Sequence, residues 1–226
     1  MEHPRRRFLE WLGGSSLFGA AMIPSLRPPL GESRKAPDHA PPIADTWDMS
    51  WTERVAGRYR AVFDSPEPAD GAALFRAVAW CDMYKDVYGT ERGEMSPVVV
   101  FRHSAIPLIM QNAFWEQYDA GKRFKLKDER GKWARANPVS TGGAAASGNS
   151  GKYKVETFMA GGGVVLACNW AFAQLVGTIR EQDKLEPAAA RARALDLVIP
   201  GVILQPNGIF AALRAQEAGC HYIMAS

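Results

Sequence analysis

The sequence predicts an α/β protein of three layers, α/β/α, with a mostly parallel sheet of about five strands between helices. Short runs of β-branched and aromatic residues alternate along the chain with longer segments of helical periodicity. Such alternation is typical of parallel strands joined by helices that cover both faces of the sheet. A composition of 47% hydrophobic and 23% charged residues over 226 positions provides for one packed core.

Five segments have the character of strands. The first, residues 58–63, stops at a turn-forming cluster that contains two prolines. The second, residues 98–101, reads Val-Val-Val-Phe, which is typical of a strand buried on both faces, and Pro97 is acceptable at its first position. The other three strands are expected at residues 164–167, 201–204 and 220–224.

Helical periodicity follows each of the first four strands. Asp70 is the predicted N-cap of the first helix. Further helices are expected over residues 105–118, 155–160, 170–178, 187–195 and 206–218, the last stopped by Gly219. Residues 122–151 lack periodicity, which predicts a flexible insertion in a domain that spans residues 47–226, either a functional lid or a disordered loop.

The first 40 residues are predicted to be a targeting segment and a linker. Arg5, Arg6, Phe8 and Leu9 match the twin-arginine signal pattern. The apolar stretch 11–23 is too short to cross a bilayer as an ordinary helix, and a proline-rich linker follows it. We therefore expect a periplasmic or otherwise exported protein delivered by the twin-arginine translocase, with the signal either cleaved or kept as an anchor. The alternative is a chance arginine run on a cytosolic protein.

Charge and cysteine content exclude several classes of function. The net charge is +3, but the first 40 residues hold six basic and four acidic side chains, so the body is nearly neutral and offers no basic stripe for nucleic acid. The three cysteines form no C-x-x-C pair and the histidines do not cluster, so we expect no zinc site, no thioredoxin motif and no bound cofactor. In an oxidising compartment at least one thiol stays unpaired.

Ligand sites of parallel sheets lie past the carboxyl ends of the strands, where helices begin. Cys168 is the main candidate there, because a helix that starts at Asn169 would favour its thiolate form. The alternative is an inert core cysteine, the role we expect of Cys81 and Cys220. His103 is the candidate acid or base beside Cys168. Four further strand-end residues are candidates for binding substrate: Arg102, Ser65, Asn169 and Asn207.

Three segments of the chain together resemble the DsrE/DsrF-like family of sulfur-oxidation proteins. They are residues 163–168, a strand that ends in Cys168; residues 200–209, a second strand with a Pro-x-Gly helix start; and residues 214–223, with an Ala-Gln-Glu-x-Gly ending. Residues 98–112 are similar to an exported branch of the family that carries twin-arginine signals. The resemblance implies a three-layer fold, homo-oligomers, and a strand-end cysteine that carries sulfur as a persulfide and passes it to a partner protein. Cys168 matches that position.

Three hypotheses about function follow. The first is an exported sulfur carrier or sulfurtransferase that acts through Cys168, with a sulfur donor or acceptor protein as partner. The second is a non-catalytic, oligomeric binding or assembly module in which Cys168 is buried. The third is a periplasmic protein associated with a metal or haem through His103 or methionines, since twin-arginine export suits proteins that fold before they cross a membrane.

Overall fold

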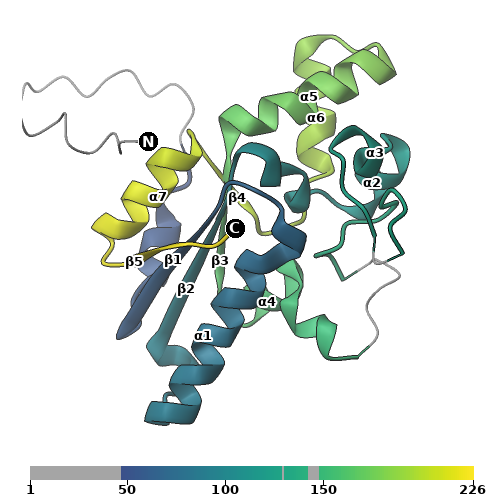
Figure 1. Ribbon diagram of the computed structural model, residues 1–226. Helices are drawn as coiled ribbons and strands as arrows, with labels where there is room; N and C mark the ends of the chain where they lie inside the picture. Colours follow the sequence, from purple (N-terminus) through teal and green to yellow (C-terminus); the bar gives the residue numbers. More distant parts are fainter. Residues whose placement is uncertain (1–46, 129, 142–147) are drawn as a thin grey trace, which may run out of the picture. The chain divides into compact units, whose positions relative to one another are not determined.

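The computed structural model describes residues 47–128, 130–141 and 148–226, and there five strands form one parallel sheet (Figure 1). The strands are β1 Tyr59–Ser65, β2 Met95–Phe101, β3 Val164–Cys168, β4 Ile203–Gln205 and β5 His221–Met224. Their order across the sheet is β4-β3-β2-β1-β5. The predicted α/β/α class with a parallel sheet is confirmed. The twin-arginine segment and residues 142–147 lie outside the described residues.

The central strands alternate their side chains between two buried faces. In β1, Val62 packs into one core and Phe63 into the other, and the registers Val62 to Val98 and Val98 to Val164 continue the first row across the sheet. All seven residues of β2 are buried. A β-branched run suits such a strand because both of its faces meet apolar neighbours.

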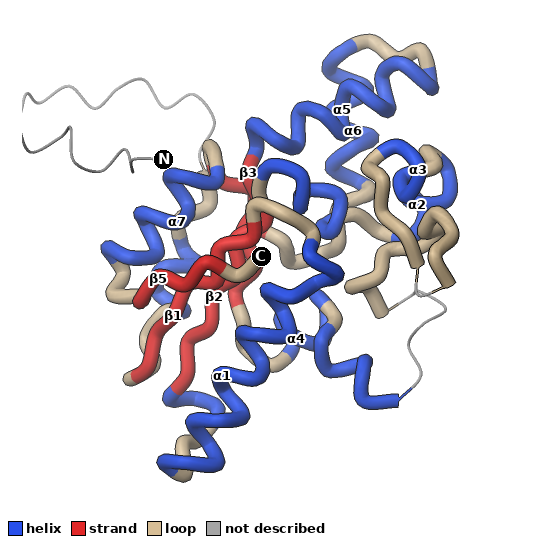
Figure 2. Tube along the Cα trace, in the orientation of Figure 1, coloured by secondary structure: helices blue, strands red, loops and turns tan. Residues whose placement is uncertain are grey.

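The larger core lies on the face of the sheet that carries α1, α4 and α5 (Figure 2). These helices are α1 Ala72–Tyr88, α4 Val155–Ala160 and α5 Asn169–Asp183, and α6 Pro187–Asp196 packs on α5. Phe63, Leu74 and Phe172 are almost fully buried in this core. The connections from β1 to β4 therefore place their helices mainly on this side.

The opposite face is covered by α7 Gly208–Glu217 and the short 3-10 helix η2 Ser50–Arg54. Helix α7 contacts every strand of the sheet, and Ala211 and Ala215 let it approach closely. Trp51 of η2 is fully buried beside Val55. Because α7 joins β4 to β5 across this face, β5 reaches the far side of β1, where it forms an edge of the sheet (Figure 1).

Two expectations about helices were wrong. Asp70 does not cap α1: it lies in the 3-10 helix η3 Ala69–Gly71 with a φ of 52°, and Gly71, with a φ of 82°, is the residue before the helix. The helix expected over 105–118 is divided into the 3-10 helix η5 His103–Ile109 and α2 Asn112–Gln117. Between them Met110 forms an antiparallel bridge with Val198, and Pro107 lacks the N–H of a regular helix.

The predicted insertion contains folded elements at its start and end. The short helices α3 Ala120–Arg123 and η6 Gly148–Tyr153 overlap its two ends. Asn137 is buried, and its side-chain amide donates hydrogen bonds to the carbonyl oxygens of Leu108 and Met110. Val139 is also buried and its backbone pairs with Val155. Residues 134–140 are therefore attached to the domain by specific polar and apolar contacts.

The proline in β2 is placed differently from the expectation. Pro97 is the third residue of the strand, not the first, and β2 is the central strand of the sheet. Pairing between β2 and β3 begins only at Val98. The side of Pro97 that faces β3 therefore needs no ladder hydrogen bond, which is why a residue without an N–H is tolerated there. Helix η4 Arg92–Glu94, with a capping box between Glu91 and Glu94, leads into this strand.

Candidate functional site

Cys168 lies where a buried strand becomes a helix. It is the last residue of β3 and the N-cap of α5, and its Sγ accepts a hydrogen bond from the backbone N–H of Ala171 at 3.4 Å. The residue is only 6% exposed, is a free thiol, and packs in the core on the α5 side of the sheet. Its position matches the sequence expectation, with the thiol at the edge of the core.

Two other candidate residues, Asn169 and His103, occupy different surroundings. The side-chain oxygen of Asn169 accepts a hydrogen bond from Arg191 of α6 at 3.0 Å, which ties α5 to α6. His103, the first residue of η5, is exposed and has a φ of 49°. Within the described residues the imidazole of His103 has no hydrogen-bond partner or ion pair, so nothing there pairs it with Cys168.

Ser65 and Asn207 are used in local structure. The hydroxyl of buried Ser65 donates to the carbonyl oxygen of Glu67 at 2.8 Å and closes the turn after β1. The side-chain oxygen of Asn207 accepts from the N–H of Phe210 at 2.8 Å and caps α7. Both residues stand at the carboxyl edge of the sheet, as expected, but each is engaged by its own loop.

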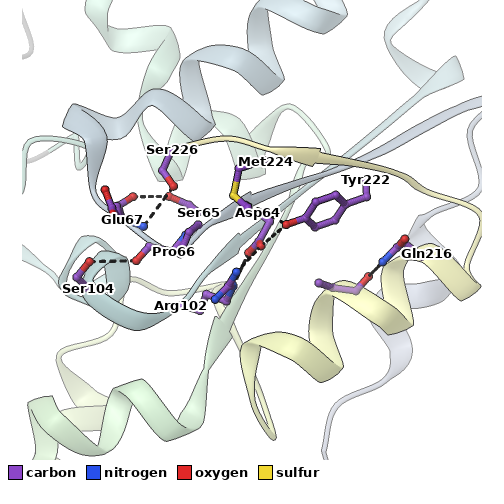
Figure 3. Close-up of polar contacts among 11 residues, drawn as sticks. Asp64, Ser65, Pro66, Glu67, Arg102, Ser104, Gln216, Tyr222, Met224 and Ser226 are labelled. Atoms are coloured by element: carbon purple, nitrogen blue, oxygen red, sulfur yellow. Dashed lines mark hydrogen bonds and ion pairs between the residues drawn. The ribbon is translucent and has the colours of Figure 1, made fainter. Parts of the chain in front are cut away.

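Arg102 belongs to a side-chain network that sequence reasoning missed (Figure 3). Its Nε and Nη2 donate to the two carboxylate oxygens of Asp64, each at 2.7 Å, and the hydroxyl of Tyr222 donates to Oδ2 of Asp64 at 2.6 Å. The Asp64 side chain is 2% exposed and that of Arg102 is 27% exposed. Asp64 comes from β1, Tyr222 from β5, and Arg102 is the residue directly after β2.

Electrostatics within the network follow from these contacts. The hydrogen bond to Asp64 is the main reason that the pKa of Arg102 is raised above its ordinary value. Burial, followed by the hydrogen bond to Asp64, raises the pKa of Tyr222. Tyr222 therefore stays a neutral donor, and Arg102 stays charged, over the whole physiological range.

The network has only a weak signal in the sequence. Asp64 is a lone acidic residue at the end of an apolar strand, which marks it as a group that needs a buried partner. Its partners are 38 and 158 residues away along the chain. No spacing rule connects them, because they meet only through the order of strands in the sheet.

The other two cysteines occupy different surroundings. Cys220 is buried, and burial raises the pKa of its thiol to about 11. Cys81 is half-buried in α1 and lines a pocket of about 160 Å³, where Nη1 of Arg92 lies 3.8 Å from its Sγ. Burial raises the pKa of Cys81, and Arg92 partly opposes that effect.

The two pockets do not bring the candidate residues at the strand ends together. A second pocket, of about 360 Å³, is lined by Asp48, Leu195 and residues 198–204 along the β4 edge. Neither pocket includes Cys168, His103, Ser65 or Asn207. Arg102 contacts Gly208 at the start of α7, whereas the thiol of Cys168 packs on the α5 side. The structure thus brings Arg102 together with Asp64 and Tyr222, and not with Cys168.

Comparison with protein-family models and with curated proteins gives no match to this chain. Among the described residues no group of three histidine, cysteine or acidic side chains is arranged to hold a metal ion. In the same part of the chain we find no helix with the length and apolar character needed to cross a membrane.

Proposed function

We propose that this chain is an exported sulfur-transfer protein that carries sulfane sulfur as a persulfide on Cys168. The single observation that carries the proposal is the position of Cys168 as N-cap of α5, with the N–H of Ala171 directed at its sulfur. An N–H group fixed in that direction stabilises negative charge on the sulfur during attack. The resemblance to DsrE/DsrF-like proteins and the twin-arginine pattern support the same proposal.

The transfer step needs no bound cofactor. The Cys168 thiolate attacks the outer sulfur of a persulfide donor, a new sulfur–sulfur bond forms on Cys168, and the donor thiolate leaves with the electron pair. The reverse attack by an acceptor thiol unloads the protein. Cys168 has little exposed surface, so a partner has to approach closely at the start of α5. His103, exposed after the neighbouring strand β2, is the candidate to exchange a proton with the leaving thiol.

Intact-mass analysis after treatment with polysulfide tests this function. We expect one additional sulfur atom on the folded wild-type protein, none on Cys168→Ser, and an undiminished gain on Cys220→Ala, which replaces an equally buried thiol. Transfer of that sulfur to a small acceptor thiol should restore the original mass. A wild-type protein that takes up no sulfur, or takes it up equally in Cys168→Ser, would refute the proposal.

A second function, a non-catalytic assembly module, is favoured by one observation. The surface formed by α7 and β5 exposes five large apolar side chains: Ile209, Phe210, Leu213, Tyr222 and Met224. Strand β5 is a sheet edge without lysine, proline or a bulge to protect it. Such a surface suits homo-oligomer formation. Light scattering of the wild type and of Leu213→Glu tests it, with Met83→Glu on α1 as a control of similar exposure. A monomeric wild type refutes this function.

A further inference from the structure

Arg191 of α6 reaches across to the first turn of α5. Its Nη2 donates a hydrogen bond to the side-chain oxygen of Asn169 at 3.0 Å. Its guanidinium carbon lies 5.9 Å from the centre of the Phe172 ring, within the range of a cation–π contact. Asn169 and Phe172 are the first and fourth residues of α5, and residues three apart share one face of a helix. One side chain of α6 therefore holds both ends of the turn that follows Cys168.

The same turn carries the N–H group that is directed at Cys168. Ala171 is the third residue of α5, and its backbone N–H donates to the Sγ of Cys168 at 3.4 Å. The first N–H groups of a helix lack carbonyl partners within the helix, and helix ends fray. Because Asn169 and Phe172 are held on either side of Ala171, its N–H group stays directed at the sulfur.

Helix α6 is a fixed support for Arg191. Helices α5 and α6 lie side by side (Figure 1). Ala190 and Ala194, which stand on either side of Arg191 in the chain, are fully buried in the core cluster that also contains Phe172 and Cys168. The backbone of α6 therefore cannot move away from α5 without opening this core, and the reach of Arg191 to Asn169 is set by that packing.

The stability of α5 does not explain the charge of Arg191. Within the described residues its guanidinium forms no ion pair with a carboxylate. A cation at the start of a helix also faces the positive end of the helix dipole, which is unfavourable. Negative charge on the sulfur of Cys168, at the same end of α5, offsets this repulsion. The placement of Arg191 therefore suits a charged sulfur atom more than a neutral one.

We propose that Arg191 and Asn169 are positioning residues that set the reactivity of Cys168. This inference rests on the proposed function. Arg191 acts through Asn169: it keeps the first turn of α5 formed, so that the N–H of Ala171 is in place when negative charge develops on the sulfur. The packing of α6 on α5 thereby controls a thiol that α6 itself does not carry.

Hydrogen exchange of backbone amides, followed by NMR, measures the positioning separately from sulfur transfer. Arg191→Met should raise the exchange rate of the Ala171 amide about tenfold, the effect expected for loss of one hydrogen bond. The amide of Ile179, in the interior of the same helix, should keep its wild-type rate. Asn169→Ala should have the same effect as Arg191→Met, and the double variant should add nothing further. Additive effects of the two substitutions would show that they act independently and would overturn the inference.

Alkylation of Cys168 by iodoacetamide at neutral pH, followed by peptide mass spectrometry, measures the reactivity itself. The rate should fall about tenfold in Arg191→Met and in Asn169→Ala. Arg193→Met is the matched control, because it removes an arginine of the same helix that donates to Gln117 at 3.2 Å, and it should keep the wild-type rate. An equal fall in Arg193→Met would overturn the inference. A fall in Arg191→Met with a wild-type rate in Asn169→Ala would show an effect of charge alone and would also overturn it.

Sulfur loading from polysulfide separates this inference from the proposed function. The rate of mass gain on Cys168 should fall in parallel with the alkylation rate in Arg191→Met and Asn169→Ala. A wild-type protein that takes up no sulfur, but whose alkylation depends on Arg191, would refute the carrier function and leave the positioning role standing. Loading at the wild-type rate in Arg191→Met would refute the positioning role and leave the carrier function standing.

Discussion

Gly208 at the start of α7 lies directly against the side chain of Arg102. A Cβ at position 208 would be 2.5 Å from Cβ and 2.5 Å from Cδ of Arg102. This contact joins the helix that covers one face of the sheet to the end of its central strand. Glycine is needed at position 208 because a side chain would not fit against Arg102. The backbone angle of Gly208 is not the reason.

Replacing Gly208 with alanine should therefore destabilise the protein. The added methyl group has to displace Arg102 or the start of α7, at a cost of about 1–3 kcal/mol in the free energy of unfolding. The matched control is Gly177→Ala in α5, where a Cβ would meet nothing within 4 Å, and which should stabilise the protein by about 0.5–1 kcal/mol. Urea unfolding measures both. Equal effects of the two substitutions would contradict the contact.

The three thiols should react with a small alkylating reagent in the order Cys168, Cys81, Cys220 at neutral pH. Cys168 has the N–H of Ala171 directed at its sulfur. Cys81 is more exposed, but burial raises its pKa, and the pKa of Cys220 is raised to about 11. Peptide mass spectrometry over time gives the order. A Cys168 that labels only on denaturation would be a core residue, and the assembly function would then replace sulfur transfer.

Stability should decline between about pH 9 and pH 11. The folded Cys220 thiol keeps its proton up to its raised pKa of about 11, whereas an unfolded thiol loses it near the ordinary pKa of 9.0. The stabilisation is thus complete below pH 9 and is lost as pH rises through 11, by up to about 2–3 kcal/mol. Unfolding free energies of the wild type and of Cys220→Ala should converge over this range. A constant difference between the two proteins would argue against the raised pKa.

Deletion of residues 1–40 should leave a domain that melts cooperatively. The described contacts begin just before η2, where the backbone carbonyl oxygen of Asp48 accepts a hydrogen bond from Gln205 at 3.0 Å. Trp51 of η2 is fully buried. A longer deletion, of residues 1–56, should cost about 3–5 kcal/mol because it removes Trp51 from the core. Thermal unfolding followed by circular dichroism compares the two. Loss of cooperativity in the shorter deletion would mean that the N-terminal segment is part of the fold.

Replacement of both Arg5 and Arg6 with lysine should leave the protein in the cytoplasm with its fold unchanged. The translocase receptor of the twin-arginine pathway is expected to recognise the guanidinium pair, which lysine does not reproduce. Cell fractionation locates the protein, and circular dichroism of the purified variant checks the fold. Normal export of the Lys-Lys variant would indicate another route.

Local pattern was sufficient for most elements of the fold. The β-branched run at 98–101 predicted a doubly buried strand, and all of β2 is buried. The strand that ends in Cys168 and the helix after it were also predicted, because periodicity and turn residues depend on neighbours in sequence. The predicted helix over 105–118 failed because Pro107 and the bridge from Met110 to Val198 divide it, and that bridge is a tertiary contact.

The sequence by itself determined the α/β class, the five strands and the residues that stand at their carboxyl ends. Only the tertiary structure decided which of those residues meet. Helix α7 crosses the whole sheet and places β5 beside β1, so Tyr222 reaches Asp64, and Arg102 turns to the same carboxylate. Lateral strand order and register are set by which helix buries which face, a long-range packing choice that local periodicity does not encode.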